Sequence, residues 1–130
     1  MNIASCVTGI QHLGIPTNDI EKTIDFYKEL GFEVAYETIN EASGQRVAFL
    51  KLKNLVIETY QNNLAAGKPG AINHVALDVL DIEATYEIIK KGDYTILDKE
   101  IRYLPFWKNG VRFFNILGPN EEIIEFSQML

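Results

Sequence analysis

Residues 12–34, HLGIPTNDIEKTIDFYKELGFEV, and residues 74–96, HVALDVLDIEATYEIIKKGDYTI, align without a gap at a constant offset of 62 residues. The two segments are identical at His12/His74, Asp19/Asp81, Ile20/Ile82, Glu21/Glu83, Thr23/Thr85 and Lys28/Lys90. Both histidines of the chain therefore occupy the same position of an internal repeat. A long repeat in two copies indicates two fused supersecondary units, because a solenoid usually needs three or more copies.

The repeat continues to the end of each half of the chain. VAFLKLKNLVIETYQ (47–61) corresponds to VRFFNILGPNEEIIEFSQ (111–128), so that Glu58 matches Glu125 once extra turn residues are allowed in the second copy. A chain of 130 residues with 47% hydrophobic content can bury one core but not two independent ones. We therefore predict a single domain over 1–130, with module 1 at about 9–61, a linker at about 62–71 and module 2 at about 72–128.

The net charge, the single cysteine and the hydrophobic pattern restrict which binding partners and which cellular location are expected. The net charge of -6 argues against nucleic acid, which needs a clustered positive surface. Cys6 is the single cysteine, so no intrachain disulfide can form, and the N-terminal residues lack the features of a signal peptide. No run of 18 apolar residues occurs, so no membrane segment is expected. These features predict a cytoplasmic protein without a membrane or nucleic-acid partner.

Each copy of the repeat reads as one strand, one helix and three strands. Alternating apolar residues predict a strand from Gly9 to Thr17, and Asn18 and Asp19 then offer an N-cap for a helix that Gly31 ends. The apolar stripe of this helix consists of Ile20, Ile24 and Tyr27, and its counterpart of Ile82, Tyr86 and Ile89. The further strands are expected at 32–39, 46–52 and 55–60, and at 94–98, 111–116 and 122–127. The predicted fold class is therefore α+β, with two βαβββ modules.

Four residues in repeat-equivalent positions have the chemistry of metal ligands: His12, Glu58, His74 and Glu125. Side chains alternate along a strand, so both glutamates point away from the helices if Ile57 and Ile124 pack against them. Two imidazoles and two carboxylates suit a divalent Zn, Ni, Co, Mn or Fe(II) ion, with positions left for water or substrate. The sequence predicts a metal site at these residues without ranking the metals.

Each candidate site residue also has a simpler structural interpretation. A single strand histidine is more often structural, and a strand glutamate usually faces water, so the hypothesis depends on all four residues together. Cys6 lacks a basic neighbour and is expected to be inert. Phe106 and Trp107 lie in KEIRYLPFWKNG (99–110), which is predicted as a long loop; they suit core cover and substrate contact equally.

The quoted segments, together with LVIETYQ and GPNEEIIEFSQ, resemble the vicinal oxygen chelate (glyoxalase/bleomycin resistance/dioxygenase) superfamily, and in particular its glyoxalase I (lactoylglutathione lyase) branch. The resemblance covers nearly the whole chain after residue 8, and it implies that the two βαβββ modules form a curved mixed sheet. It implies a metal at His12, Glu58, His74 and Glu125, and a homodimer in which each site can draw one His/Glu pair from each chain. It also implies a lyase or isomerase that moves a proton through an enediolate stabilised by the metal.

The resemblance also implies roles for individual residues. Glu125 is expected to be the main base, and Glu58 serves the mirror-image proton or the return step. Asn62, four residues after Glu58, matches a contact to the thiol conjugate in glutathione-using glyoxalases. Those enzymes tend to have arginines where this chain has Pro16 and Gly70, which puts glutathione itself in doubt. The glyoxalase I reaction on the hemithioacetal of glutathione stays the leading expectation, and a hemithioacetal of another thiol or a small hydroxy-carbonyl compound is the alternative substrate.

Three other classes of the superfamily remain open. Methylmalonyl-CoA epimerases use the same modules and also remove a proton next to a carbonyl, but often have Gln at the position of Glu58. Fosfomycin-type thiol transferases use a His, His, Glu triad, which would leave Glu58 without a role. Metal-free binding or resistance proteins normally lack the ligand set, so they fit this sequence least.

Overall fold

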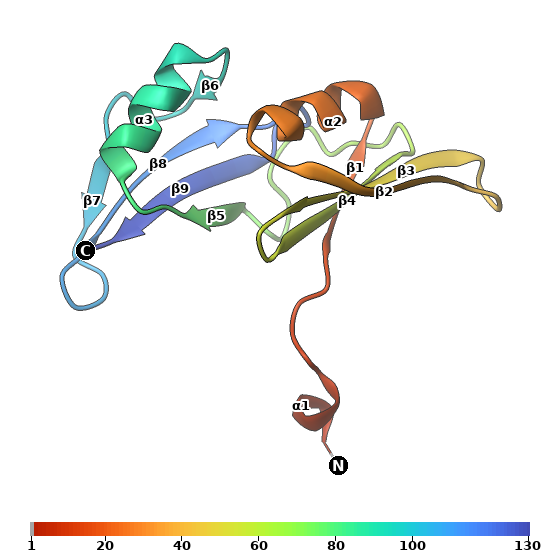
Figure 1. Cartoon of the computed structure of the whole chain (residues 1–130), viewed down its shortest axis with the longest axis horizontal. Helices are drawn as coiled ribbons and strands as arrows, with labels where there is room; N and C mark the ends of the chain where they lie inside the picture. The colour runs from red at the N-terminus through yellow and green to blue at the C-terminus, as the bar shows by residue number, and fades with distance from the viewer. Residues whose placement is uncertain (1) are drawn as a thin grey trace. The chain divides into compact units, whose positions relative to one another are not determined.

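The computed structural model describes residues 2–130, and the chain divides between Ala65 and Ala66 into two compact units. The first unit contains α1 (Ile3–Cys6), β1 (Leu13–Thr17), α2 (Ile20–Glu29), β2 (Glu33–Asn40), β3 (Gln45–Leu52) and β4 (Leu55–Gln61). The second contains β5 (His74–Asp78), α3 (Ile82–Lys91), β6 (Thr95–Ile96), β7 (Arg102–Leu104), β8 (Val111–Leu117) and β9 (Ile123–Met129). Figure 1 labels these elements in chain order.

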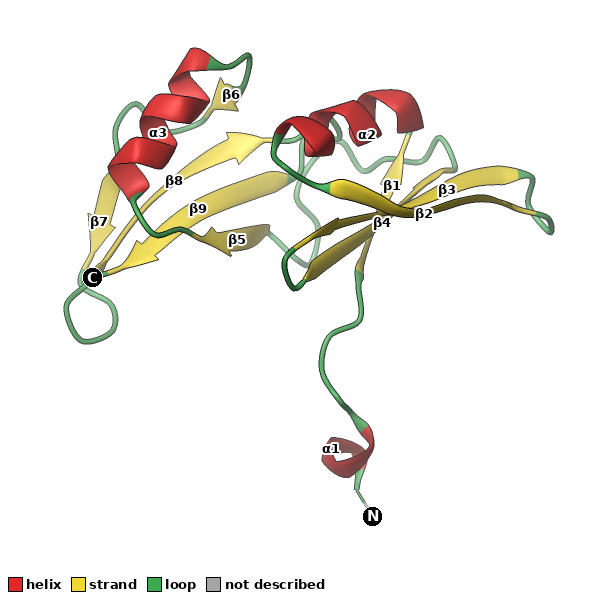
Figure 2. Cartoon of the chain, viewed as in Figure 1, coloured by secondary structure: helices red, strands yellow, loops and turns green. Residues whose placement is uncertain are grey.

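Each unit is built on one mixed sheet. In the first unit the strand order is β1-β4-β3-β2, with β1 parallel to β4 and the other pairs antiparallel. In the second unit the order is β5-β9-β8-β6, β5 is parallel to β9, and β7 also pairs with β8. One helix lies over one face of each sheet, as Figure 2 shows. The expected α+β class is therefore confirmed; the first unit has the expected βαβββ order, and the second has the same order with one additional short strand, β7.

The helices begin where the sequence predicts an N-cap. The Asp19 side chain accepts a hydrogen bond from Lys22 N at 3.0 Å, and Asp81 does the same for Ala84 N at 3.0 Å. Gly31, after the C-cap of α2, has a φ of 104°, which favours glycine. The predicted stripe of α2 is buried at Ile20, Ile24 and Tyr27. Burial of this stripe fixes which face of the sheet α2 covers.

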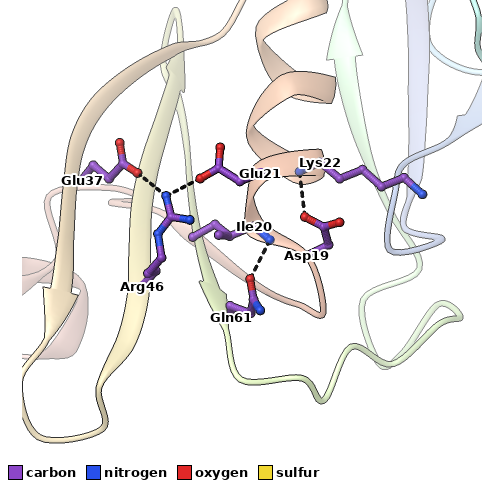
Figure 3. A network of polar contacts seen from close by, with 7 residues as sticks. All are labelled: Asp19, Ile20, Glu21, Lys22, Glu37, Arg46 and Gln61. Carbon is purple, nitrogen blue, oxygen red and sulfur yellow. Dashed lines mark hydrogen bonds and ion pairs between the residues drawn. The ribbon is translucent and has the colours of Figure 1, made fainter.

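A glutamine from the last strand of each module ties down the helix start. The Oε1 atom of Gln61 accepts from the backbone N–H of Ile20 at 3.0 Å, and Gln128 accepts from Ile82 at 2.9 Å. Figure 3 shows the contact in the first unit. The first N–H groups of a helix have no partner within the helix, so each glutamine satisfies one of them from a strand distant in sequence.

Arg46 of β3 links three elements of the first unit. Its guanidinium donates to the carboxylate of Glu37 on β2 at 3.0 Å and pairs with the carboxylate of Glu21 on α2 (Figure 3). The hydrogen bonds to Glu21 and Glu37 raise the pKa of Arg46 above its ordinary value. These contacts lie on the helix-covered face of the sheet. Glu37 pairs directly with the buried Ala48, and Arg46 is two residues before Ala48 on the same strand, so all three share one face.

Some predicted boundaries were wrong. The first strand starts at Leu13 and not at Gly9, because its pairing with β4 begins at the Leu13–Ile57 position. The short helix α1 was not predicted. The segment 99–110, predicted as loop, contains β7, whose residues pair with β8 farther along the chain. No helix among residues 2–130 has the length and apolar character that a membrane crossing requires.

Candidate metal and catalytic site

His12 and Glu58 meet in the first unit. His12 immediately precedes β1, and Glu58 lies on β4 opposite Gly14 and Phe49. The Nε2 atom of His12 is 3.5 Å from Oε1 of Glu58, and both side chains are half-buried. The neighbours of Glu58 along β4, Ile57 and Thr59, point to the other face and are buried. Strand alternation therefore places this pair on the face that α2 does not cover.

His74 and Glu125 form the matching pair in the second unit. His74 is the first residue of β5 and Glu125 is on the neighbouring parallel strand β9. Nε2 of His74 is 3.4 Å from Oε2 of Glu125. The adjacent residues Ile124 and Phe126 are buried on the opposite face. Each unit thus brings together one predicted histidine and one predicted glutamate. No further His, Cys, Asp or Glu of the described residues joins the pair within its unit.

An amide side chain holds each imidazole by its other nitrogen. Nδ1 of His12 is 2.9 Å from Oε1 of Gln11, and Nδ1 of His74 is 3.0 Å from Oδ1 of Asn73. An amide oxygen accepts a hydrogen bond, so the tautomer with the proton on Nδ1 matches both contacts and leaves Nε2 as the ring nitrogen that faces the carboxylate. The sequence reasoning missed these two residues, although an amide residue precedes each histidine of the repeat.

The chemistry of these pairs fits a divalent ion. In each pair Nε2 of an imidazole faces a carboxylate oxygen, and in the tautomer with the proton on Nδ1 both atoms have lone pairs with which they could bind a divalent cation. Two ligand atoms that each lie about 2.1 Å from one ion, at tetrahedral or octahedral angles, are roughly 3.0 to 3.4 Å apart. The observed separations of 3.5 Å and 3.4 Å are close to that span. Each pair therefore has nearly the separation expected of two atoms that bind one ion.

Aromatic and small residues surround the pair in the first unit. The Phe49 ring meets the His12 ring edge-on, with centroids 5.6 Å apart, and Tyr36 lies 6.2 Å from Phe49. A Cβ atom at Gly14 would be 3.9 Å from the Glu58 carboxylate, an ordinary contact distance. The uncovered face of this sheet therefore joins polar donors to an aromatic surface, a combination typical of small-molecule sites.

A polar cluster lies beside Glu125 in the second unit. Asn115 of β8 pairs directly across from Glu125, and its backbone N and Nδ2 donate to Oδ2 of Asp98 at 2.7 and 3.0 Å. Nη1 of Arg102 lies 3.5 Å from the other oxygen, Oδ1, of Asp98. The sequence reasoning did not single out these three residues, because a long-range strand pairing brings them together.

The weaker substrate-site predictions fall on exposed or locally bonded residues. Asn62 follows β4, and its Oδ1 accepts from Leu64 N at 2.9 Å, so the side-chain oxygen closes a local turn. Phe106 and Trp107 lie between β7 and β8 and are 55% and 75% exposed. Both rings project from the second unit and are not part of its core. Their substrate role stays a prediction.

Fold and residue pattern together define the class of protein. A model of the Glyoxalase/Bleomycin resistance protein/Dioxygenase superfamily matches residues 9–126, and the chain belongs to this superfamily. Among curated proteins the chain is 36% identical over 126 residues to the uncharacterized protein YwbC of Bacillus subtilis (strain 168). The match covers 92% of this chain and 96% of YwbC. The family is therefore established by sequence as well as by fold.

Solved structures share the fold at low identity. A glyoxalase family protein from Enterococcus faecalis superposes with a TM-score of 0.78 at 22% identity, covering 92% of this chain and 97% of that one. The fosfomycin resistance protein FosX from Listeria monocytogenes, solved with Mn(II) and sulfate, superposes with a TM-score of 0.69 at 17% identity. That match covers 95% of this chain and 94% of FosX. Identity at this level shows the common fold alone.

Proposed function

We propose that the protein is a metal-dependent lyase or isomerase of the glyoxalase I type, which moves a proton between adjacent carbons of a hydroxy-carbonyl or thiol-hemithioacetal substrate. The carrying observation is the pair of repeat-equivalent His–Glu contacts at 3.5 and 3.4 Å, each with its imidazole held through Nδ1. His12, Glu58, His74 and Glu125 would together hold one divalent Ni, Zn, Co, Mn or Fe ion.

The four ligands come as two half-sets, one from each unit of the chain. We therefore propose a homodimer in which each site takes His12 and Glu58 from one chain and His74 and Glu125 from its partner. Closed twofold symmetry would give such a dimer two identical sites. FosX, with which this chain shares its fold, was solved with Mn(II).

A bound divalent ion would polarise two adjacent substrate oxygens and so acidify the neighbouring C–H group. Glu125 is the proposed base, which accepts that proton on a carboxylate oxygen and returns it to the adjacent carbon. Its side chain is only 18% exposed, so little water competes for the proton. Glu58, at the equivalent position of the other module, would remove the proton from a substrate of opposite stereochemistry or return the proton to the product. The histidines would bind the ion through Nε2 and have no proposed part in the proton transfer.

The first test is metal content by elemental analysis, followed by a hemithioacetal isomerisation assay on the same samples. Wild type reconstituted with Ni, Zn, Co and Mn in turn should bind metal stoichiometrically, and His12→Ala should lose it. Asp78→Asn is a matched control, because Asp78 lies on β5 on the same face as His74 but outside the pair. Metal-free wild type after reconstitution would refute the metal site and favour a binding protein.

Loss of metal in Glu58→Ala would also distinguish the proposal from a fosfomycin-type transferase, which needs three ligands. The contact between Glu58 and His12 at 3.5 Å is the observation that favours four ligands over three. Activity on a hemithioacetal, compared with activity on an acyl-CoA epimer, would separate a glyoxalase from an epimerase.

A further inference from the structure

The guanidinium of Arg102 contacts an aromatic ring and a carboxylate, and most of its N–H groups remain available to a further partner. Its Cζ lies 5.3 Å from the centroid of the Phe113 ring, and Nη1 is 3.5 Å from Oδ1 of Asp98. Asp98 is fixed in turn by two hydrogen bonds from Asn115 and is only 12% exposed. Arg102 itself is 57% exposed. A guanidinium that lies over an aromatic ring and pairs with a carboxylate loses less freedom when it binds a further group.

The strand register places Arg102 on the same face as Glu125. Arg102 of β7 pairs with Phe113 of β8, and Phe113 pairs with Ser127 of β9, two residues from Glu125. Residues that pair directly, and residues two apart on one strand, share a face. Neighbouring strands are about 4.8 Å apart, so a guanidinium over the Phe113 ring lies on the order of 10 Å from the Glu125 carboxylate. That span is within the length of a small substrate.

The contacts of Arg102 leave its N–H fork available. The contact with Asp98 is an ion pair at 3.5 Å, and the contact with Phe113 places Cζ over the ring, 5.3 Å from its centroid. No hydrogen bond within residues 2–130 is made by the Arg102 guanidinium. Arginine has five donors in a plane that matches the two oxygens of a carboxylate. The ion pair with Asp98 involves Nη1 and orients the guanidinium, while Nε and Nη2 remain available to bind a carboxylate.

We propose that Arg102 binds a carboxylate at the far end of the substrate from the proposed proton transfer, so that the substrate class is hydroxy-carbonyl compounds that carry a carboxylate. This inference rests on the proposed function, because it takes Glu125 as the reacting end. Asp98 and Asn115 are positioning residues for Arg102. The carboxylate selects the substrate and sets its direction along the sheet, from β9 towards β7.

Arg112 provides a matched control on the same strand system. It neighbours Phe113 on β8 but points to the helix-covered face, where its Nη2 donates to Glu83 of α3 at 3.1 Å. Arg112→Gln removes the same positive charge at nearly the same place in the sheet. It leaves the Glu125 face unchanged, so long-range charge effects can be separated from direct binding.

The test uses hydroxamates, which chelate metal ions through two adjacent oxygens, bound to the metal-loaded protein in a calorimeter. The probes are the monohydroxamates of succinic, adipic and suberic acid and the methyl ester of each. A charge-assisted bidentate contact should make one of the acids bind roughly tenfold or more tightly than its ester. Arg102→Gln should bring the acid to the affinity of its ester and leave the ester unchanged, and Arg112→Gln should keep the preference.

The ester is an internal measure of folding and metal loading, because it needs the metal but not Arg102. Arg102→Lys keeps the charge without the planar fork and should retain only part of the preference. Equal binding of every acid and its ester in wild type, or a preference that survives in Arg102→Gln, would overturn this inference while leaving the metal site intact. Failure of both probe types on wild type would instead overturn the proposed metal site and this inference with it.

Discussion

Nε2 of His74 lies 3.4 Å from Oε2 of Glu125, and the same two atom types of His12 and Glu58 are 3.5 Å apart in the other unit. The two contacts come from residues that the internal repeat makes equivalent. In both, an amide side chain from the preceding residue holds Nδ1 and leaves Nε2 directed at the carboxylate. The two modules therefore share the proposed ligand atoms and the amide groups that contact the imidazoles.

Removing the amide that orients His12 should weaken metal binding without removing a ligand. Gln11→Ala is expected to lower metal affinity by about tenfold, the lower end of the usual effect, because Gln11 is exposed. Competition with a chromogenic chelator measures the change. Gln11→Asn should keep most of the affinity, since Asn73 makes the same contact to His74 at 3.0 Å. Unchanged affinity in Gln11→Ala would mean that the amide does not orient the ring.

Glu125→Gln should damage turnover far more than folding or metal content. The amide oxygen can still face His74, but it cannot take a proton at neutral pH, so turnover should fall by roughly 10² to 10⁴. Elemental analysis and a thermal melt on the same sample establish that metal and fold remain. A variant that keeps metal and wild-type turnover would remove Glu125 from the role of base and leave Glu58 as the candidate.

A heterodimer of two inactive chains should recover one of its two sites. If each site takes one pair from each chain, the His12→Ala chain and the His74→Ala chain still leave one complete ligand set between them. The two chains are given different affinity tags, co-expressed and purified as the mixed dimer. We expect about half of the wild-type metal content and activity. A mixed dimer without metal would show instead that both pairs of a site belong to one chain.

Gln61→Ala should destabilise the first unit through the start of α2. The variant leaves the N–H of Ile20 without its acceptor, and such a loss costs about 1 kcal/mol in the free energy of unfolding. Urea denaturation measures this change. Gln128→Ala should cost a similar amount, because it breaks the equivalent bond to Ile82. Gln61→Glu keeps an oxygen acceptor near a helix N-terminus and should lose little stability, whereas a loss equal to that of Gln61→Ala would contradict this account.

Local patterns of the sequence were sufficient for the elements of the repeat. The Asp19 and Asp81 caps, the buried stripe of α2 and the alternation around Glu58 depend on neighbours a few residues apart, which the sequence displays directly. Comparison of the two copies also identified both His–Glu pairs. Periodicity was less informative for β7 and for the start of β1, because their extents depend on which residues a distant strand offers for pairing.

The sequence by itself determined the two-module α+β fold and the identity of the four candidate ligands, because a repeat and strand alternation are properties of spacing along the chain. The tertiary structure alone decided which atoms of each pair face one another, that Gln11 and Asn73 hold the imidazoles, and that Arg102 lies on the Glu125 face. These relationships arise from side-chain torsions and from strand register, and register joins residues whose separation in sequence carries no periodic signal.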